Sequence, residues 1–247
     1  MYEPRVYRNQ MNTGRFTSFV LSIKESDLWI GCDSASFKKE MADYASTYIL
    51  NLRKSLESHI ESNPEFQNSL KPIENSLNFS KIAREMIIAG NKAGIGPMSA
   101  VAGAFSQYIG LALIETFGCR ELVVENGGDL FISVEKELTI SVYAGKSPLS
   151  EKIAIVIPQN FGNIGVCTSS GTVGHSFSYG TADALMIACR NTLLADAYAT
   201  AFANLVKHEN DVETVINSIK SHPEILSAVV IKGKKMAVCG GLELKII

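Results

Sequence analysis

In the first third of the chain the pattern of apolar and polar residues changes from strand-like runs to a helical repeat. Residues 15–33, RFTSFVLSIKESDLWIGCD, form two β-branched and aromatic runs around a polar KESD, which predicts a hairpin. Between Ser36 and Glu61 apolar residues recur every three or four positions, which predicts a long amphipathic helix. Residues 63–79 contain two prolines and mixed polarity, so we expect a connection there. A second helix is expected from about Ser80 to Gly90.

One strongly apolar segment separates two groups of strand-like runs. Residues 94–118, GIGPMSAVAGAFSQYIGLALIETFG, begin with turn residues and continue as a helix rich in Ala, Gly and Ser. Its small side chains allow another backbone or a ligand to approach closely. Residues 119–168 predict several strands separated by turns such as ENGGD and EKE. Residues 182–189 predict another strand, and residues 191–208 predict a strong helix.

The C-terminal part returns to sheet. A final helix is expected near residues 210–221, followed by strands at 226–232 and 235–239. Helices inserted into a mostly antiparallel, hairpin-linked sheet are typical of the α+β class. The 247 residues contain no repeat and suffice for one large core. We therefore expect a single α+β domain over residues 1–247.

Composition narrows the classes of partner. The formal net charge is −2 and the two signs are interspersed, which excludes a broad basic face for nucleic acid or anionic lipid. The N-terminal residues 1–16 lack the apolar core of a signal peptide or membrane anchor, and no apolar run approaches the length of a spanning helix. We expect a cytoplasmic protein with a small-molecule partner, and the sequence leaves self-association open.

The cysteines favour thiols over cross-links. They are odd in number, scattered and never spaced as CxxC, which argues against a disulfide framework or a zinc ribbon. The five are Cys32, Cys119, Cys167, Cys189 and Cys239. We expect most of them to be reduced and buried.

A carboxylate and a hydroxyl share one face of the predicted helix at 191–208. In LADAYAT, Asp196 and Thr200 lie four residues apart and so project from the same face. Two such oxygens can hold Mg²⁺, which keeps waters and uses phosphate oxygens of its ligand. The alternative is that Asp196 is solvated and Thr200 bonds back to its own helix.

The segment ENGGDLF has two interpretations as well. Asn126, Gly127, Gly128 and Asp129 form an ordinary hairpin signal, because Asn and Gly tolerate positive φ. The same glycines would admit a ligand next to bare backbone. In that case Glu125 and Asp129 flank the turn as polar anchors.

The segment CTSSGTVGHSFSYGTADA, residues 167–184, carries seven Ser or Thr hydroxyls. Between Lys152 and Arg190 the only side chain able to become cationic is His175. A phosphate bound here must therefore be met by backbone N–H groups, hydroxyls or a metal ion. A Walker loop is excluded, because the chain has no GKS or GKT in this segment. His175 itself fits either a general base or a loop hydrogen bond.

The order of these motifs resembles the ApbE-like superfamily, whose better-known members are magnesium-dependent FAD:protein FMN transferases. The shared pieces are a small-residue helix, ENGGD, CTSSG, a loop His and LADAYAT. The segments RVYR, ESDL, GPMSAVAGAF and ENGGDL resemble a cytoplasmic branch of that superfamily catalogued as uncharacterised. The resemblance implies an α+β, T-fold-type architecture of mostly antiparallel sheets with packed helices.

The resemblance also implies roles for individual residues. Asp196, Thr200 and the carbonyl of Ala102 take the positions of the metal ligands. His175 and Asp183 would serve phosphoryl or nucleotidyl chemistry. FAD or a related pyrophosphate nucleotide, bound with Mg²⁺, would contact two short segments, which comprise Asn126, Gly127, Gly128, Asp129, Thr168, Ser169, Ser170 and Gly171.

The sequence departs from the transferase pattern at three places. Gly103 stands where the transferases have Lys, Tyr108 stands where they have Asp, and DPxTG after the loop His is replaced by SYGTADA. These departures leave a binding module without turnover as an alternative to flavinyl or nucleotidyl transfer.

A second alternative is a sulfur-handling protein that uses Cys167. A partly exposed thiol beside this loop would have a lowered pKa and could carry a persulfide. Against this, Cys is a common small apolar residue at strand ends.

Overall fold

The computed structural model describes residue 8 and residues 14–173 and 179–247. An eight-stranded sheet runs through the molecule in the order β1-β2-β3-β4-β7-β8-β9-β10, and every neighbouring pair is antiparallel. Its strands are β1 (Phe16–Ile23), β2 (Ser26–Asp33), β3 (Leu122–Asn126), β4 (Asp129–Ser133), β7 (Ile164–Ser169), β8 (Ala184–Cys189), β9 (Ile225–Lys232) and β10 (Lys235–Gly240).

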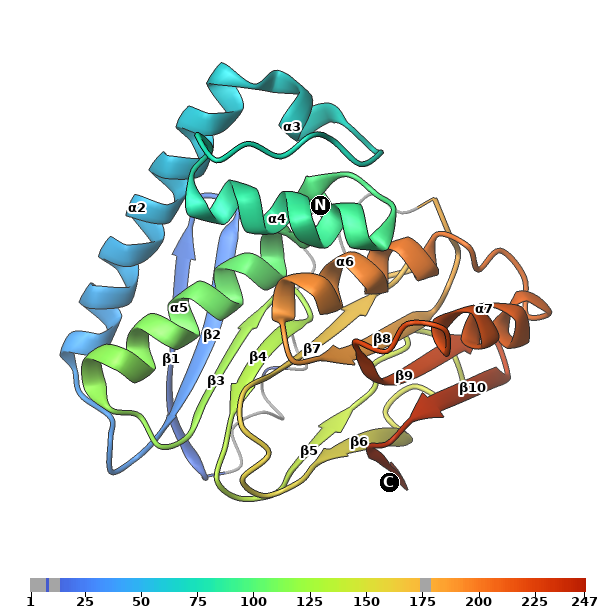
Figure 1. Cartoon of the computed structure of the whole chain (residues 1–247). Coiled ribbons are helices and arrows are strands. Elements are labelled where there is room, and N and C mark those ends of the chain that lie inside the picture. The colour runs from blue at the N-terminus through green and yellow to red at the C-terminus, as the bar shows by residue number, and fades with distance from the viewer. Residues whose placement is uncertain (1–7, 9–13, 174–178) are drawn as a thin grey trace.

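A smaller sheet and a layer of helices cover the two faces of the large sheet (Figure 1). The smaller sheet has the order β11-β6-β5, from β5 (Leu138–Ser141), β6 (Ile153–Ile157) and β11 (Glu243–Ile246). The helices are α2 (Glu40–Ser62), α3 (Pro64–Asn68), α4 (Lys81–Ala93), α5 (Val101–Phe117), α6 (Thr192–Ala203) and α7 (Asp211–Ile219), with a 3₁₀ turn at Pro97–Ala100 before α5.

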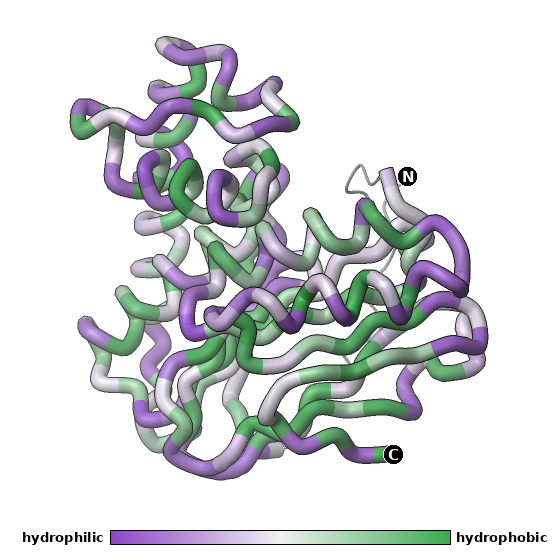
Figure 2. Tube along the Cα trace, turned by 45° about the vertical axis from the view of Figure 1, so that its right-hand side comes forward, coloured by the Kyte–Doolittle hydropathy of each residue, from purple (hydrophilic) through white to green (hydrophobic). Residues whose placement is uncertain are grey.

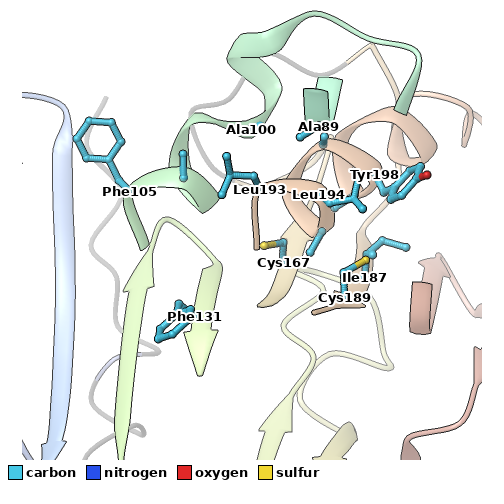
Figure 3. Close-up of a cluster of buried hydrophobic side chains, with 14 of the residues drawn as sticks. Ala89, Ala100, Phe105, Phe131, Cys167, Ile187, Cys189, Leu193, Leu194 and Tyr198 are labelled. Carbon is cyan, nitrogen blue, oxygen red and sulfur yellow. The ribbon is translucent and has the colours of Figure 1, made fainter. Parts of the chain in front are cut away.

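Each face of the large sheet has its own apolar core. The helices and the sheet enclose one cluster, in which Cys167, Ile187, Leu193 and Tyr198 lie between the sheet and α6 (Figure 3). The second cluster lies between the two sheets and contains Ile132, Ile155 and other aliphatic side chains. Hydrophobic positions follow the strands and inner helices, and hydrophilic ones gather on the connections (Figure 2).

The apolar helix α5 is a core helix. Together with the preceding 3₁₀ turn it forms Pro97–Phe117, which among the described residues is the one helix long and apolar enough to cross a membrane by length and composition. This corrects the expectation that no apolar run approaches the length of a spanning helix. Its Ala104, Ile109 and Leu113 have no exposed surface. Gly110 faces the ring of Phe131, where a Cβ would approach a ring carbon to 2.2 Å. The small residues therefore let α5 lie directly on the sheet.

The α+β class and most of the predicted elements are confirmed. The hairpin is β1–β2, the long helix is α2, and residues 184–189 form β8. Two details differ. The expected connection at 63–79 contains the short helix α3, which begins with Pro64 at its first position. The helix predicted over 191–208 ends at Ala203, because residues 204–208 turn toward α7.

Candidate functional site

Two buried carboxylates face each other between α6 and the large sheet. Asp129 is the first residue of β4, and Asp196 lies in α6; each is 7% exposed. The N-terminus of α6 is capped by Asn191, whose side chain accepts from the N–H of Leu194 at 2.9 Å. From there α6 packs along β7, which is next to β4 in the sheet. The topology thus brings a residue of the ENGGD turn to a residue of LADAYAT.

The first turn of α5 supplies further polar atoms at this position. Asp196 Oδ2 accepts a hydrogen bond from the Gly103 N–H at 2.8 Å, so the carboxylate lies at the positive end of the helix. The Ala102 carbonyl accepts from Asn126 Nδ2 at 3.2 Å. The Ser106 hydroxyl lies 3.1 Å from that carbonyl and 2.9 Å from the carbonyl of Asp129. Asp196, Asn126, Asp129 and the Ala102 carbonyl therefore form one polar cluster.

Burial controls the protonation of this cluster. Desolvation raises the pKa of Asp196 to about 7, against the opposing effect of the Gly103 and Ala102 N–H groups. Desolvation also raises the pKa of Asp129 well above its ordinary value, and the negative charge of Asp196 raises it further. In the part of the chain that the structure describes, no Lys or Arg is ion-paired with either carboxylate. Among the described residues the pair therefore has no basic side chain to balance its charge, and burial favours its partly protonated form.

The ENGGD turn is fixed by Glu125, which forms a buried ion pair with Arg8. Gly127 and Gly128 have φ values of 68° and 105°, which explains the two glycines at these positions. Glu125 accepts from the Gly128 N–H at 2.9 Å and from Arg8 Nε at 2.6 Å. Arg8 also bonds to Asp27 at 2.8 Å. Sequence reasoning missed Arg8, because nothing near residue 8 indicates a partner in β3.

The hydroxyl-rich turn after β7 uses its own donors. The N–H groups of Thr172 and Val173 donate to Ser170 Oγ at 3.1 and 3.0 Å, and the Gly171 N–H donates to the Ala182 carbonyl at 2.9 Å. The Thr168 N–H donates to the Gly128 carbonyl at 3.3 Å. The backbone N–H groups of residues 168 and 171–173 are therefore already used within the protein, which favours the hydroxyls or a metal ion among the three expected ways to meet a phosphate. The binding roles of residues 168–171 stay predictions. The side-chain hydroxyls of Thr168 and Ser169 lie at the end of β7 nearest this turn.

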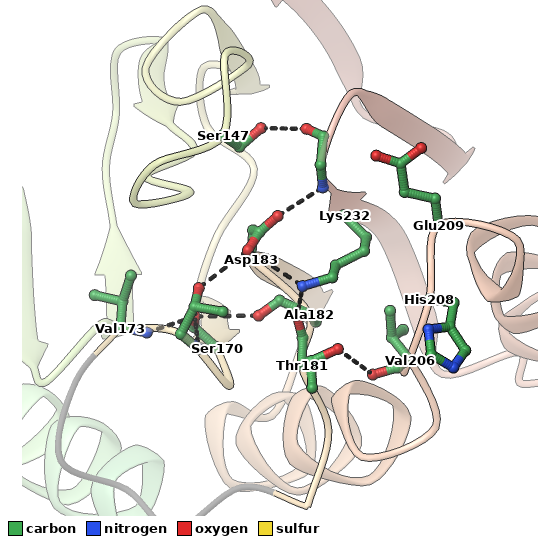
Figure 4. Close-up of polar contacts among 12 residues, drawn as sticks. Ser147, Ser170, Val173, Thr181, Ala182, Asp183, Val206, His208, Glu209 and Lys232 are labelled. Atoms are coloured by element: carbon green, nitrogen blue, oxygen red, sulfur yellow. Dashed lines mark hydrogen bonds and ion pairs between the residues drawn. The ribbon is translucent and has the colours of Figure 1, made fainter.

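Asp183 lies in a second, separate polar cluster (Figure 4). Its carboxylate accepts from the Gly233 N–H at 2.6 Å and from Thr172 Oγ1 at 3.1 Å, and it lies 3.7 Å from Lys232 Nζ. Lys232 also donates to the Thr181 carbonyl. The sequence analysis placed no Lys or Arg near this loop; the structure corrects this, because β9 brings Lys232 to it from a distant part of the sequence.

The remaining predicted residues fall outside these contacts. Thr200 is partly buried in α6, one turn after Asp196, and its metal-binding role stays a prediction. His175 lies outside the described residues. Among the residues that the structure describes, no group of three His, Cys, Asp or Glu side chains is arranged to hold a metal ion. A cation at the carboxylate pair would therefore need carbonyl, hydroxyl or ligand oxygens as well.

Comparison with known proteins gives this arrangement a context. Residues 8–225 match the family model described as "AbpE bacteria". The chain belongs to this family. It is 36% identical to a UPF0280 protein of Methanococcus maripaludis strain C7 over 92% of this chain and 91% of that protein. It is 39% identical to a UPF0280 protein of Methanosarcina barkeri over 88% of this chain and 84% of that protein.

Solved structures show the same fold at low sequence identity. The flavinyl transferase ApbE of Pseudomonas stutzeri, in its apo form, superposes with a TM-score of 0.57 at 13% identity, over 91% of this chain and 93% of that one. The ApbE protein of Thermotoga maritima gives a TM-score of 0.55 at 13% identity, over 90% and 96% of the two chains. The resemblance to the ApbE-like superfamily and its fold are thereby confirmed.

Two departures from the transferase pattern have physical reasons in this ApbE-like chain. A Cβ on Gly103 would lie 2.5 Å from the Thr192 carbonyl and 2.8 Å from Asp196 Cβ. No lysine fits there unless α6 moves away from α5. Tyr108 points toward α4, where its hydroxyl donates to Glu85 at 2.9 Å.

Of the two interpretations of Cys167, the structure supports the small buried residue and contradicts the partly exposed thiol. The Cys167 side chain has no exposed surface, and the thiol lies within hydrogen-bond distance of the Asp129 carboxylate and of the Thr192 carbonyl, the latter at 3.5 Å. Desolvation raises the pKa of Cys167, and the charges of Asp129 and Asp196 raise it further. A buried, protonated thiol is inert. The persulfide hypothesis therefore loses its physical basis in this ApbE-like chain.

Proposed function

We propose that this ApbE-like protein binds a divalent cation at the Asp129–Asp196 pair together with a flavin nucleotide. The observation that carries the proposal is a pair of carboxylates, each 7% exposed, beside the Ala102 carbonyl and without a basic side chain among their described contacts. Burying two unpaired carboxylates opposes folding. A bound cation would offset that cost.

The chemistry of the donors fits Mg²⁺. Asp196, Asp129 and the Ala102 carbonyl offer oxygen atoms only, and the Thr200 hydroxyl lies one turn along the same helix. Hard oxygen donors suit Mg²⁺, which completes its shell with waters and phosphate oxygens. When bound, Mg²⁺ neutralises the charge of a pyrophosphate. In this proposal Asp196 and Asp129 hold the cation, and Asn126 fixes the Ala102 carbonyl.

A pyrophosphate nucleotide fits the surroundings of the pair. The structural neighbour from Pseudomonas stutzeri is a flavinyl transferase, which favours FAD among such ligands. The hydroxyl-bearing residues Thr168 and Ser169 follow Cys167 on β7, and Cys167 is the residue that pairs with Asp129. Because the donors of the next turn are used internally, the cation and these hydroxyls would meet the phosphates. A cytoplasmic location is part of the same proposal.

Binding is the part of the function that the site supports best. Transfer of the flavinyl or nucleotidyl group would require an acceptor hydroxyl to attack the phosphorus while the site stabilises the developing charge. Gly103 stands where the transferases have Lys, and α6 leaves no space for a side chain there. This favours a binding module over a transferase. His175 and Asp183 remain predicted catalytic residues for the transfer alternative.

Two measurements test this function. Small molecules released from freshly purified protein should include a flavin nucleotide by mass spectrometry. Calorimetry with FAD should show binding that requires Mg²⁺ and is lost in Asp196→Ala, whereas the exposed Asp43→Asn serves as a matched control. Absence of FAD binding, or equal binding by Asp196→Ala, would contradict the proposal. Product formed over a long incubation would favour transfer over binding alone.

A further inference from the structure

Two thiols that are far apart in the sequence meet at the end of α5 opposite to the carboxylate pair. Cys32 lies in β2, where it pairs with Leu122 of β3, and Cys119 lies in the connection between α5 and β3. The Cys32 thiol donates to Asp33 Oδ2 at 3.9 Å, and it lies close enough to the Cys119 thiol for each to shift the pKa of the other. The Cys119 thiol is 3.6 Å from the Leu113 carbonyl at the end of α5. Both side chains belong to the core between the helices and the large sheet.

A carboxylate keeps these two segments together. Asp33, which follows Cys32, accepts from the N–H groups of Arg120 and Glu121 at 3.1 and 3.2 Å. The Asp33 N–H donates to the Glu121 carbonyl at 3.0 Å. The backbones on either side of the thiol pair are thus fixed to each other. This framework keeps the segments that carry the two thiols next to each other.

The two thiols differ in access. Cys32 has no exposed surface, whereas Cys119 is 7% exposed and precedes Arg120, whose side chain is 61% exposed. The neighbouring Cys32 thiol lowers the pKa of Cys119, and the pKa of Cys32 is raised in turn. A thiolate near the surface reacts first with an oxidant, and a buried partner thiol resolves the product. The geometry therefore distinguishes an attacking thiol from a resolving thiol.

We propose that Cys32 and Cys119 form a reversible disulfide when the protein meets a low-molecular-weight disulfide. The Cys119 thiolate attacks one sulfur of the oxidant, which forms a mixed disulfide and releases one thiolate. Cys32 then loses its proton and attacks the Cys119 sulfur, which releases the second thiolate. Two protein thiols are oxidised to one disulfide, and the oxidant is reduced to two thiols. The cross-link joins β2 to the end of α5.

The other cysteines offer comparisons within the same chain. Cys167 and Cys189 are 0% and 1% exposed and lie beneath α6. Cys239 is half-buried in β10, and among the described residues no other thiol contacts it. Cys239→Ser is therefore the matched control for the loss of a more accessible thiol that has no thiol partner.

The test is oxidation by oxidised glutathione followed by intact mass measurement and peptide mapping. Wild-type protein and Cys239→Ser should lose two hydrogens and yield a linked peptide containing Cys32 and Cys119. Cys32→Ser should instead retain glutathione at Cys119, because the resolving thiol is absent. Cys119→Ser should form neither product. Dithiothreitol should restore the starting mass.

Several results would overturn the proposal: no internal disulfide in the wild type, a disulfide between other cysteines, or the same product from Cys32→Ser and the wild type. Should either Ser variant fail to fold, the wild type alone decides. Its oxidised form should unfold about 5–10 °C higher than its reduced form, because the cross-link closes a long loop. An unchanged unfolding temperature together with the starting mass would contradict the proposal.

Discussion

The two acidic clusters of this protein are built in opposite ways. Asp129 and Asp196 are buried together and repel each other, and no Lys or Arg is paired with them in the described part of the chain. Asp183 is bound by the Gly233 N–H and by the Thr172 hydroxyl, and its charge is balanced by Lys232. Among the described residues, the Asp129–Asp196 cluster lacks a positive charge to balance its carboxylates. The Asp183 cluster contains both its hydrogen-bond donors and its cation.

We interpret this difference as one between a proposed binding site and a structural contact. A carboxylate with three polar partners stabilises the fold and gains little from a ligand. A buried carboxylate pair without a cation opposes folding, and it gains stability from any cation that fits. The same residue type therefore has opposite expected effects on stability when it is removed from the two clusters.

The largest loss of stability is expected when the Asp183 carboxylate is removed from its cluster. Asp183→Ala should lower the free energy of unfolding by about 2–4 kcal/mol, because it leaves the Gly233 N–H and the Lys232 ammonium without their acceptor. Urea denaturation followed by circular dichroism measures this. Asp43→Asn, on the exposed face of α2, should change it by less than about 0.5 kcal/mol. Equal stability of Asp183→Ala and wild type would remove the distinction between the clusters.

Gly103→Ala tests the close approach of α5 and α6. The added Cβ meets the Thr192 carbonyl at 2.5 Å, so the helices must separate, at a cost of about 1–3 kcal/mol. The shift should also weaken Mg²⁺-dependent binding of FAD, since Asp196 would lose its contact with the Gly103 N–H. Gly241→Ala is the control, because a Cβ there meets nothing within 4 Å. Unchanged stability and unchanged binding would contradict this account of the site.

Glu121 is a second carboxylate with a complete set of partners, and its contribution to stability should depend on pH. It accepts from Arg15 at 2.6 and 3.0 Å and from the N–H groups of Glu135 and Lys136, and the Arg15 hydrogen bond holds its pKa below the ordinary value. The stabilisation is therefore present above the unfolded pKa and is lost as pH falls through the lower folded pKa. Glu121→Gln should cost about 1–2 kcal/mol at pH 7. Below about pH 3 the difference from wild type should shrink; a constant difference would disprove the assignment.

The smallest expected effect has the opposite sign. At a pH high enough to ionise both carboxylates, Asp129→Asn removes one of two repelling buried charges, so it should raise the free energy of unfolding by about 1 kcal/mol in the absence of a divalent cation. Thermal unfolding in chelator measures this. A loss of stability in chelator would show that Asp129 is a structural residue like Asp183.

The sequence predicted where helices and strands lie better than it predicted which residues contact each other. Periodicity located α2, β1–β2 and β8, because burial on one face leaves a regular pattern. The order of ENGGD, CTSSG and LADAYAT indicated the superfamily, and the fold brings Asp129, Cys167 and Asp196 together. The roles predicted for these residues in binding remain predictions.

Contacts between distant segments were beyond the sequence. Lys232 reaches Asp183 through the pairing of β8 with β9, and Arg8 reaches Glu125 across the sheet. The burial of Cys167 depends on α6 lying over β7, and the meeting of Cys32 with Cys119 depends on the register of β2 with β3. No spacing of residue types along the chain contains this information.

The central claim is that the Asp129–Asp196 pair binds a divalent cation. The most direct measurement is a Mn²⁺ titration followed by electron paramagnetic resonance in the presence of FAD, since Mn²⁺ takes the same oxygen donors as Mg²⁺. Wild type and Asp183→Asn should bind Mn²⁺ with similar affinity, and Asp196→Asn should bind it at least about 10-fold more weakly. Equal binding by all three proteins, or no binding by wild type, would contradict the account.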